Sequence, residues 1–391
     1  MRPFPTLSLR ANGVRLAAFY GAFFMIAGVH LPYWPVWLSA QGMTGAEIGT
    51  LLAAATCVKI VANPLFAQWA DRRGARRGLM VMLTLVGLAA FACFGIADGF
   101  WALLAVTMVY GAALAPIMPL GENLAMGTAM EEGLDYGRVR LWGSVTFMVA
   151  AYAGGWLLEG GPAQRIYWVM LAGLVLTVFA CRALPDRRTE PSSGRSAPLG
   201  RLLRAPLFLL FLIAAGLVQA SHAVYYGFST LHWRDAGIGE GVIGLLWAEG
   251  VLAEIILFAY SGPIVRRVGV TRLLVIAAGL ATLRWMGTAF TTDAWLLIPL
   301  QALHAFSFAA CHLAAMHFIA RSLPATVSAT GQSLYSAVSM GAALAIAMLV
   351  AGTLYTSVGG LAYLAMAAMT AVGTGLAIVL GRRWDGAAMA V

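Results

Sequence analysis

Two stretches decide the fold: residues 48–80, IGTLLAAATCVKIVANPLFAQWADRRGARRGLM, and residues 243–275, IGLLWAEGVLAEIILFAYSGPIVRRVGVTRLLV. They lie 195 residues apart, half the length of the chain, and align without a gap. Identical pairs include Gly49 and Gly244, Leu51 and Leu246, and Arg72 and Arg267. Lys59, the only lysine, falls on Glu254 in this alignment. The chain is therefore an internal duplication with opposite charges at equivalent positions of two apolar segments.

The composition is typical of a membrane protein. Of 391 residues, 61% are hydrophobic and only 10% are charged, and the mean hydropathy is +0.83. Apolar stretches long enough to cross a hydrocarbon core of about 30 Å recur along the chain. They lack the alternating polarity of a membrane barrel, so we expect an all-α integral membrane fold. We count twelve stretches, at 14–38, 46–68, 78–97, 100–128, 138–158, 164–184, 206–230, 239–262, 271–291, 294–320, 326–353 and 358–381.

The arginines indicate the orientation of these helices. Nearly all of them fall in loops and tails on one side of the predicted membrane, whereas the other side holds only Arg165 and Arg234. The positive-inside rule then places both termini in the cytoplasm. The formal charge of +9 therefore reflects topology and does not indicate a nucleic-acid surface.

The loops leave little room for anything besides helices. One long polar stretch, 185–205, divides the chain into halves at 1–184 and 206–391 and is expected to be a cytoplasmic linker.

No G-x-x-x-x-G-K-[ST] sequence is present, so we expect an ion gradient rather than ATP to supply energy. The four cysteines show no metal-binding spacing, and we find no catalytic motif. We expect a monomeric protein of the lipid bilayer, with a small molecule and a proton as partners, no metal or other cofactor and no enzymatic activity.

The loop at residues 67–77, AQWADRRGARR, resembles the G-x-x-x-D-R-x-G-R-R loop of the major facilitator superfamily. Ala67 replaces the first glycine, and the second copy at residues 262–269, GPIVRRVG, lacks the aspartate. The resemblance implies a twelve-helix fold of two related halves. It also implies a cytoplasmic gate at Asp71, Arg72 and Arg267, although these residues are also explained as positive-inside anchors.

Several ionisable residues lie inside the predicted spans. At 1.5 Å per residue, Glu249 and His304 lie about 15 Å from the periplasmic side, and Lys59 and Glu254 about 20 Å. Arg284 lies about 20 Å from the cytoplasmic side. A charge at such depth is costly unless it faces a cavity or a partner. Structural salt bridges explain any one pair, but the whole set favours a transporter with a polar site between its halves.

Two more specific resemblances follow. Glu122 and Arg140, joined by LDYGRVRLWG at residues 134–143, resemble the sugar-binding pair of lactose-permease-like proton symporters. Phe147 falls where that family has a tryptophan that stacks on substrate. Arg284 and His304 match its arginine of helix 9 and histidine of helix 10, but Ser307 replaces the glutamate that carries the coupling proton there. Another group must then carry the proton, and the candidates are Glu249 and Glu254 in the eighth apolar stretch, 239–262.

The closer resemblance, over nearly the whole chain, is to the phenylpropionate permease family. It is carried by residues 135–144, by HAVYYGFS at residues 222–229, by Arg284-Trp285 and by CHLAAM at residues 311–316. It implies proton-driven import of a small aromatic carboxylate across the bacterial inner membrane. Lys59 or Arg284 suits the carboxylate. Flat apolar surfaces for the ring are offered by Phe147, Tyr225, Tyr226 and Trp247.

We expect Glu254 to take up a proton in the outward-open state and so to free Lys59 or Arg284 for the substrate. The halves then rock about a nearly neutral site and open inward. Two other functions stay open: a proton symporter for a sugar or nucleoside, and a major facilitator efflux antiporter. Against the antiporter, residues 143–155 lack the G-P-x-x-G-G ending typical of helix 5 in that group. The aromatic residues Tyr33, Trp34 and Trp37 are expected at the membrane interface.

Overall fold

The computed structural model describes residues 11–74, 76–186 and 199–389, and every regular element in these ranges is helical. The predicted linker at 185–205 lies largely outside them, so the division of the chain at that point stays a prediction. Residues 11–186 form α1 (Ala11–Ala40), α2 (Gly45–Arg73), α3 (Arg76–Ala92), η1 (Cys93–Gly95), α4 (Gly99–Leu114), α5 (Ile117–Glu132), α6 (Tyr136–Leu158) and α7 (Gln164–Ala183). We call this bundle the N half.

The C half comprises residues 206–383. Its elements are α9 (Pro206–Ala220), α10 (Ala223–Asp235), α11 (Glu240–Ala259), α12 (Ser261–Val268), α13 (Val270–Phe290), α14 (Ala294–Ala302), η2 (Ala305–Ala310), α15 (Cys311–Ser322), α16 (Ala325–Tyr335), η3 (Ser336–Ala342), α17 (Ala343–Val358), η4 (Gly359–Ala362) and α18 (Tyr363–Arg383). A short helix, α8 (Leu199–Leu202), precedes it.

Eleven helical segments of the described residues are long and apolar enough to cross a membrane. The last of them, Val327–Arg383, spans 57 residues and contains both of the final stretches that the sequence predicted. The chain turns between α17 and α18 at Gly359, whose φ of +56° suits glycine. The all-α fold with the expected series of membrane helices is therefore confirmed.

Local sequence explains where the repeated helices begin and end. α2 starts at a capping box in which Thr44 accepts from the Glu47 amide at 3.3 Å and the Glu47 carboxylate accepts from the Thr44 amide at 2.8 Å. It ends at Gly74, which adopts a left-handed conformation. The predicted fourth stretch is broken before Pro116, because proline cannot donate the hydrogen bond that would continue α4 into α5.

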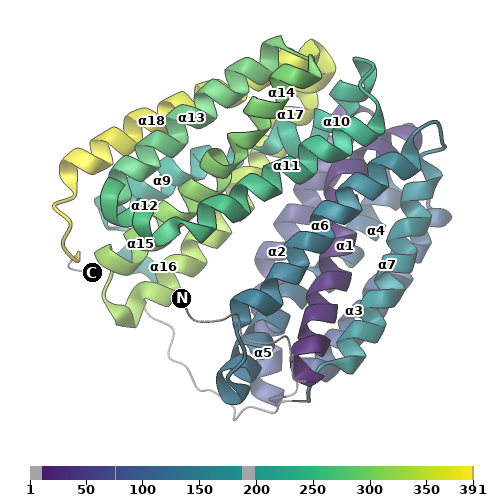
Figure 1. Cartoon of the computed structure of the whole chain (residues 1–391), viewed down its shortest axis with the longest axis horizontal. Helices are drawn as coiled ribbons and strands as arrows, with labels where there is room; N and C mark the ends of the chain where they lie inside the picture. The colour runs from purple at the N-terminus through teal and green to yellow at the C-terminus, as the bar shows by residue number, and fades with distance from the viewer. Residues whose placement is uncertain (1–10, 75, 187–198, 390–391) are drawn as a thin grey trace, which may run out of the picture.

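The two halves are packed together at one end. Figure 1 shows them diverging toward the end where α1 begins and α18 finishes. At the opposite end α2 packs against α17, and α6 packs against α11. A Cβ atom on Gly49 would lie 2.6 Å from the Met348 carbonyl oxygen, and one on Gly244 would lie 2.6 Å from the Ala151 carbonyl oxygen. Glycines at repeat-equivalent positions thus allow the backbones of the two halves to touch.

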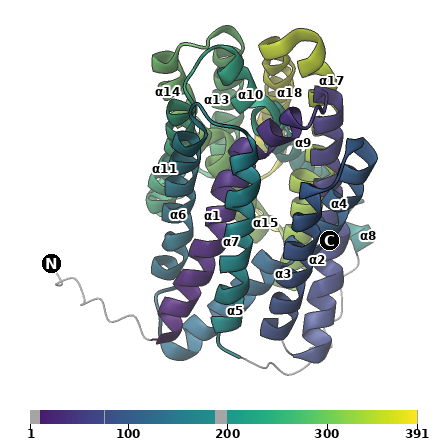
Figure 2. The ribbon, with the colours of Figure 1, turned by 90° about the vertical axis from the view of Figure 1, so that its right-hand side faces the viewer.

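Tyr33, Trp34 and Trp37 of α1 are buried inside the protein and do not face a membrane interface, so that prediction was wrong. Trp34 and Trp37 are buried and stacked, with ring centroids 4.5 Å apart. Phe94 packs edge-on against both. Figure 2 shows α1 lying beside α6 and α7, which cover it. The apolar face of α1 is therefore buried by neighbouring helices rather than by lipid headgroups.

Candidate functional site

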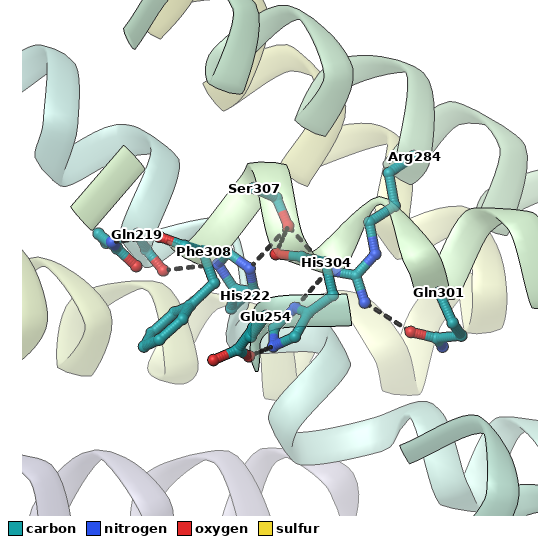
Figure 3. Close-up of polar contacts among 8 residues, drawn as sticks. All are labelled: Gln219, His222, Glu254, Arg284, Gln301, His304, Ser307 and Phe308. Carbon is teal, nitrogen blue, oxygen red and sulfur yellow. Dashed lines mark hydrogen bonds and ion pairs between the residues drawn. The ribbon is translucent and has the colours of Figure 1, made fainter. Parts of the chain in front are cut away.

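A chain of polar side chains crosses the C half (Figure 3). Glu254 of α11 contacts His304 through Oε1 and Nε2 at 2.8 Å. The Nδ1 atom of His304 accepts from Arg284 of α13, also at 2.8 Å. Arg284 donates to the Ser307 hydroxyl at 2.9 Å, and Ser307 lies 3.2 Å from Nε2 of His222. We call these five residues the relay, since each is linked to the next by a hydrogen bond.

The geometry fixes where the protons of His304 lie. Arg284 is always a donor, so Nδ1 of His304 must be the acceptor. The ring proton of a neutral His304 is then on Nε2 and is donated to the Glu254 carboxylate. With Glu254 ionised, the relay holds one cation and one anion, separated by a neutral imidazole. A proton added to Glu254 would remove the anion and leave a net positive charge.

Aromatic rings and amides hold Arg284 in place. Its guanidinium lies 4.6 Å from the Tyr225 ring centroid and 4.3 Å from that of Trp285. Gln301 accepts from it at 2.6 Å. Trp247 stacks on Tyr225 at 4.3 Å. Arg284 is only 1% exposed, so this packing keeps a buried cation in a single position.

Two irregularities of the helices present these groups to one another. His222 lies at the break between α9 and α10, where Ser221 accepts from the Trp285 indole at 2.9 Å. His304 directly precedes the π-helical segment η2. The wider turn of a π-helix displaces side chains from their regular positions, and such turns are frequent at functional sites. Here it lets His304 and Ser307 contact the same guanidinium.

The N half contains a separate cavity of about 360 Å³ between α1, α2 and α4. Lys59 lines it and has no hydrogen bond or ion pair among the described residues. The wall is mostly apolar and includes the rings of Trp34, His30 and Tyr110. His30 stacks on Trp34, with centroids 5.7 Å apart. The cavity thus combines one free cation with flat apolar surfaces.

A third polar cluster lies on α5 and α6. Arg140 donates to Glu122 at 3.0 Å, and Tyr136 also donates to that carboxylate. The guanidinium lies 4.2 Å from the Phe24 ring centroid. The side chains of Glu122 and Arg140 are about one-third exposed. The predicted pair is thus formed, but its residues are not among those that line the Lys59 cavity.

The structure separates the remaining predicted residues. Glu249 lines a different, largely apolar cavity between α6, α11 and α14, away from the relay. Phe147 is buried, and its carbonyl oxygen would lie 2.5 Å from a Cβ atom on Gly28 of α1. Tyr226 is half-buried and stacks on His222 at 5.4 Å. Lys59 and Glu254, despite their repeat relation, make no contact with each other among the described residues.

The predicted gate residues lie near helix ends. Asp71 accepts from Arg76 at 2.7 Å, across the turn between α2 and α3. Arg72 and Arg267 are exposed. Asp71 therefore joins two helices of its own half, and its described ion pair does not reach the C half.

Sequence reasoning missed several residues of these sites. Ser307 was noted only because it cannot ionise, yet it joins Arg284 to His222. Gln301 also went unnoticed, although it lies three residues before His304. The four-residue spacing of His30 and Trp34 on α1 would have suggested a stack. Nothing in the sequence indicated that Tyr110 shares their cavity.

Comparisons with known proteins agree with this architecture. The profile of the MFS_1 like family matches residues 14–365. A probable 3-phenylpropionic acid transporter of Escherichia coli is 35% identical over 88% of this chain and 91% of its own length. A maltose permease of Geobacillus stearothermophilus is 26% identical over 93% of each chain. A lactose permease of Klebsiella oxytoca is 24% identical over 78% of this chain and 79% of its own length, so the resemblance to both permease groups is confirmed.

Among solved structures, a mutant of the nucleoside transporter NupG superposes with a TM-score of 0.86. It covers 94% of this chain and 99% of its own at 14% identity, so the likeness concerns the fold alone. The chain therefore belongs to the MFS_1 like family and is a multi-pass membrane transporter of the major facilitator type.

Proposed function

We propose that the protein imports a small aromatic carboxylate together with a proton, by alternating access. The observation that carries the proposal is Lys59, which has no ion pair or hydrogen bond among the described residues and lines a mostly apolar cavity with aromatic walls. The Lys59 side chain is exposed to this cavity, where a carboxylate would pair with its charge. The apolar wall suits a phenyl ring. The name of the Escherichia coli relative points to the same class of substrate.

The relay supplies a group for proton coupling. Glu254 is ionisable and touches His304, whereas Glu249 lies in another cavity. We therefore assign the proton to Glu254, with His304 as its partner. Protonation of Glu254 and binding of a carboxylate at Lys59 change the charge of the protein by +1 and −1. The loaded protein then has the same net charge as the empty one. This lowers the cost of exposing the loaded site first to one side of the membrane and then to the other.

The orientation follows from the arginine distribution, with both termini in the cytoplasm of a bacterial cell. With this orientation, the glycine contacts at Gly49 and Gly244 lie at the periplasmic end, where they would close the transporter to the outside. The contact between His304 and Glu254 would stabilise the carboxylate that remains after proton release to the cytoplasm. Asp71, Arg72 and Arg267 belong to the opposite end, where they would form the cytoplasmic gate. The transporter works as a monomer in the inner membrane.

A second candidate is a proton symporter for a sugar or a nucleoside. It is favoured by the partly exposed Glu122–Arg140 pair, which offers both acceptors and donors to hydroxyl groups. The maltose permease among the relatives also supports it. The relay would serve such a substrate equally well, so only the substrate site distinguishes the two candidates.

The test is uptake of radiolabelled 3-phenylpropionate by proteoliposomes with an inward proton gradient, with lactose and a nucleoside in parallel. Undissociated aromatic acids cross lipid unaided, so protein-free liposomes and a Lys59→Ala variant are needed as controls. We expect accumulation above both controls that a protonophore abolishes. Uptake of lactose or the nucleoside alone would support the second candidate. Proton-driven expulsion of 3-phenylpropionate from preloaded vesicles would indicate an antiporter.

A further inference from the structure

His312 is a histidine of α15 that the relay leaves unused. Its ring stacks on Phe308 with centroids 6.5 Å apart, and Phe308 stacks on His304 at 5.6 Å. The three rings thus form a row along one face of η2 and α15. On its other side His312 meets Tyr335 at 5.8 Å. The row continues from the relay along α15 toward the cytoplasmic end of the C half.

One nitrogen of this ring is buried without a partner. Nδ1 of His312 has no hydrogen bond among the described residues, although the residue as a whole is only half-buried. An unsatisfied buried polar atom costs about 1–3 kcal/mol, so structural histidines normally use such nitrogens. His312 therefore fits a structural role poorly. Among the described residues its Nδ1 atom is free to bind a proton, and part of the residue is exposed.

Glu254 is the charged group that acts on this ring. No hydrogen bond or ion pair joins Glu254 to His312 among the described residues, so its carboxylate acts on the ring through space. Tyr335 is the other described titratable side chain against His312. Counted from the periplasmic ends of their helices at 1.5 Å per residue, Glu254 lies about 21 Å deep. His304 lies about 15 Å deep and His312 about 27 Å. The carboxylate is therefore intermediate in depth between the two histidines, and it contacts the outer one.

We propose that His312 takes the coupling proton from Glu254 and passes it to water on the cytoplasmic side. The O–H bond of the Glu254 carboxyl breaks as its proton passes to a bridging water molecule, and that water gives a proton to a nitrogen of His312, which leaves a carboxylate and an imidazolium. The imidazolium then releases the proton to water and returns to its neutral form. The carboxylate meanwhile accepts from Nε2 of His304, which the structure places 2.8 Å from Oε1 of Glu254. This inference rests on the proposed function, because it assigns the exit of the same proton.

The test compares His312→Gln with His317→Gln in full-length protein in proteoliposomes. His317 lies on the same helix, five residues further and about 140° around it. Two rates are measured: gradient-driven accumulation, which requires release of the proton, and exchange of labelled for unlabelled substrate, which does not. For His312→Gln we expect accumulation to slow tenfold or more while exchange stays within twofold. His317→Gln should alter neither rate. Raising the internal pH should restore part of the lost rate, because hydroxide can then deprotonate Glu254 directly.

Three results would overturn the inference. His312→Gln could leave both rates unchanged, or lower both equally, which is the outcome of a structural role. It could also lower accumulation without any rescue by internal pH. A His312→Asn variant, assayed in the same way, guards against a folding defect of one substitution. If the unsubstituted protein exchanges the aromatic carboxylate without proton-driven accumulation, the proposed coupling fails first, and the assignment to His312 falls with it.

Discussion

Adding one methyl group at either repeat-equivalent glycine should open the periplasmic side. Alanine at Gly49 would place Cβ 2.6 Å from the Met348 carbonyl oxygen, and alanine at Gly244 would place it 2.6 Å from the Ala151 carbonyl oxygen. Both neighbours are backbone atoms and cannot rotate away. α2 must then move away from α17, or α11 away from α6. These helices are already apart in the outward-open state, so the added methyl group causes no strain there.

The size of the effect follows from the contacts. Overpacking by one methyl group costs about 1–3 kcal/mol. Alanine also favours a helix over glycine by about 1 kcal/mol, but this gain is the same in both states and cancels. Each substitution should therefore shift the equilibrium about 5- to 150-fold toward the outward-open state. A matched control is Gly279→Ala in α13, where a Cβ atom has no neighbour within 4 Å.

The assay is labelling of a cavity cysteine from outside intact cells by a membrane-impermeant maleimide. Leu31→Cys places the thiol on the cavity wall, in a background with the exposed Cys57 and Cys93 replaced by serine. The two glycine variants should label at least fivefold faster than the background, and Gly279→Ala should not. Equal labelling in all four proteins would refute the claim that these glycines close the periplasmic end.

Three further substitutions test the sites. Replacing Lys59 with alanine should weaken binding of an aromatic carboxylate by about 10- to 150-fold, because a charged hydrogen bond contributes about 1.5–3 kcal/mol; unchanged affinity in equilibrium binding would remove Lys59 from the site. Replacing Glu254 with glutamine should abolish uphill accumulation in proteoliposomes while labelled substrate still exchanges, since an amide cannot carry the proton; intact uphill uptake would contradict the assignment. Replacing Arg140 with methionine should leave carboxylate affinity within about threefold and lower the free energy of unfolding by about 1 kcal/mol or less, because the ion pair with Glu122 is partly exposed. A loss of affinity as large as that expected for Lys59 would instead place the substrate at this pair.

The fold was predictable because the information is local and repeated. Hydrophobic runs give the membrane helices, and the repeat aligns Gly49 with Gly244, two of the glycines at which the halves touch. Individual contacts were less predictable. Helical spacing cannot tell whether Trp34 faces lipid or a neighbouring helix, since both surroundings are apolar. The interfacial position expected for it was wrong for that reason.

The candidate site shows the same limit. The depth of His304, Arg284 and Glu254 could be counted along the helices, and the three residues are indeed linked. Depth alone also suggested Glu249, which rotation about α11 directs into a different cavity. The repeat suggested that Lys59 and Glu254 belong together, but equivalent positions in two halves need not touch. Rotation and packing, which a single sequence specifies poorly, decide these contacts.

The most direct test of the proposed mechanism is the proton movement that accompanies substrate uptake. Aromatic carboxylate is added to weakly buffered proteoliposomes without a gradient, and external pH is recorded. Passive entry of the undissociated acid is subtracted with the Lys59→Ala variant. We predict a transient alkalinisation above this background that disappears in Glu254→Gln. Substrate entry above background without alkalinisation, or alkalinisation that persists in Glu254→Gln, would contradict proton coupling through this residue.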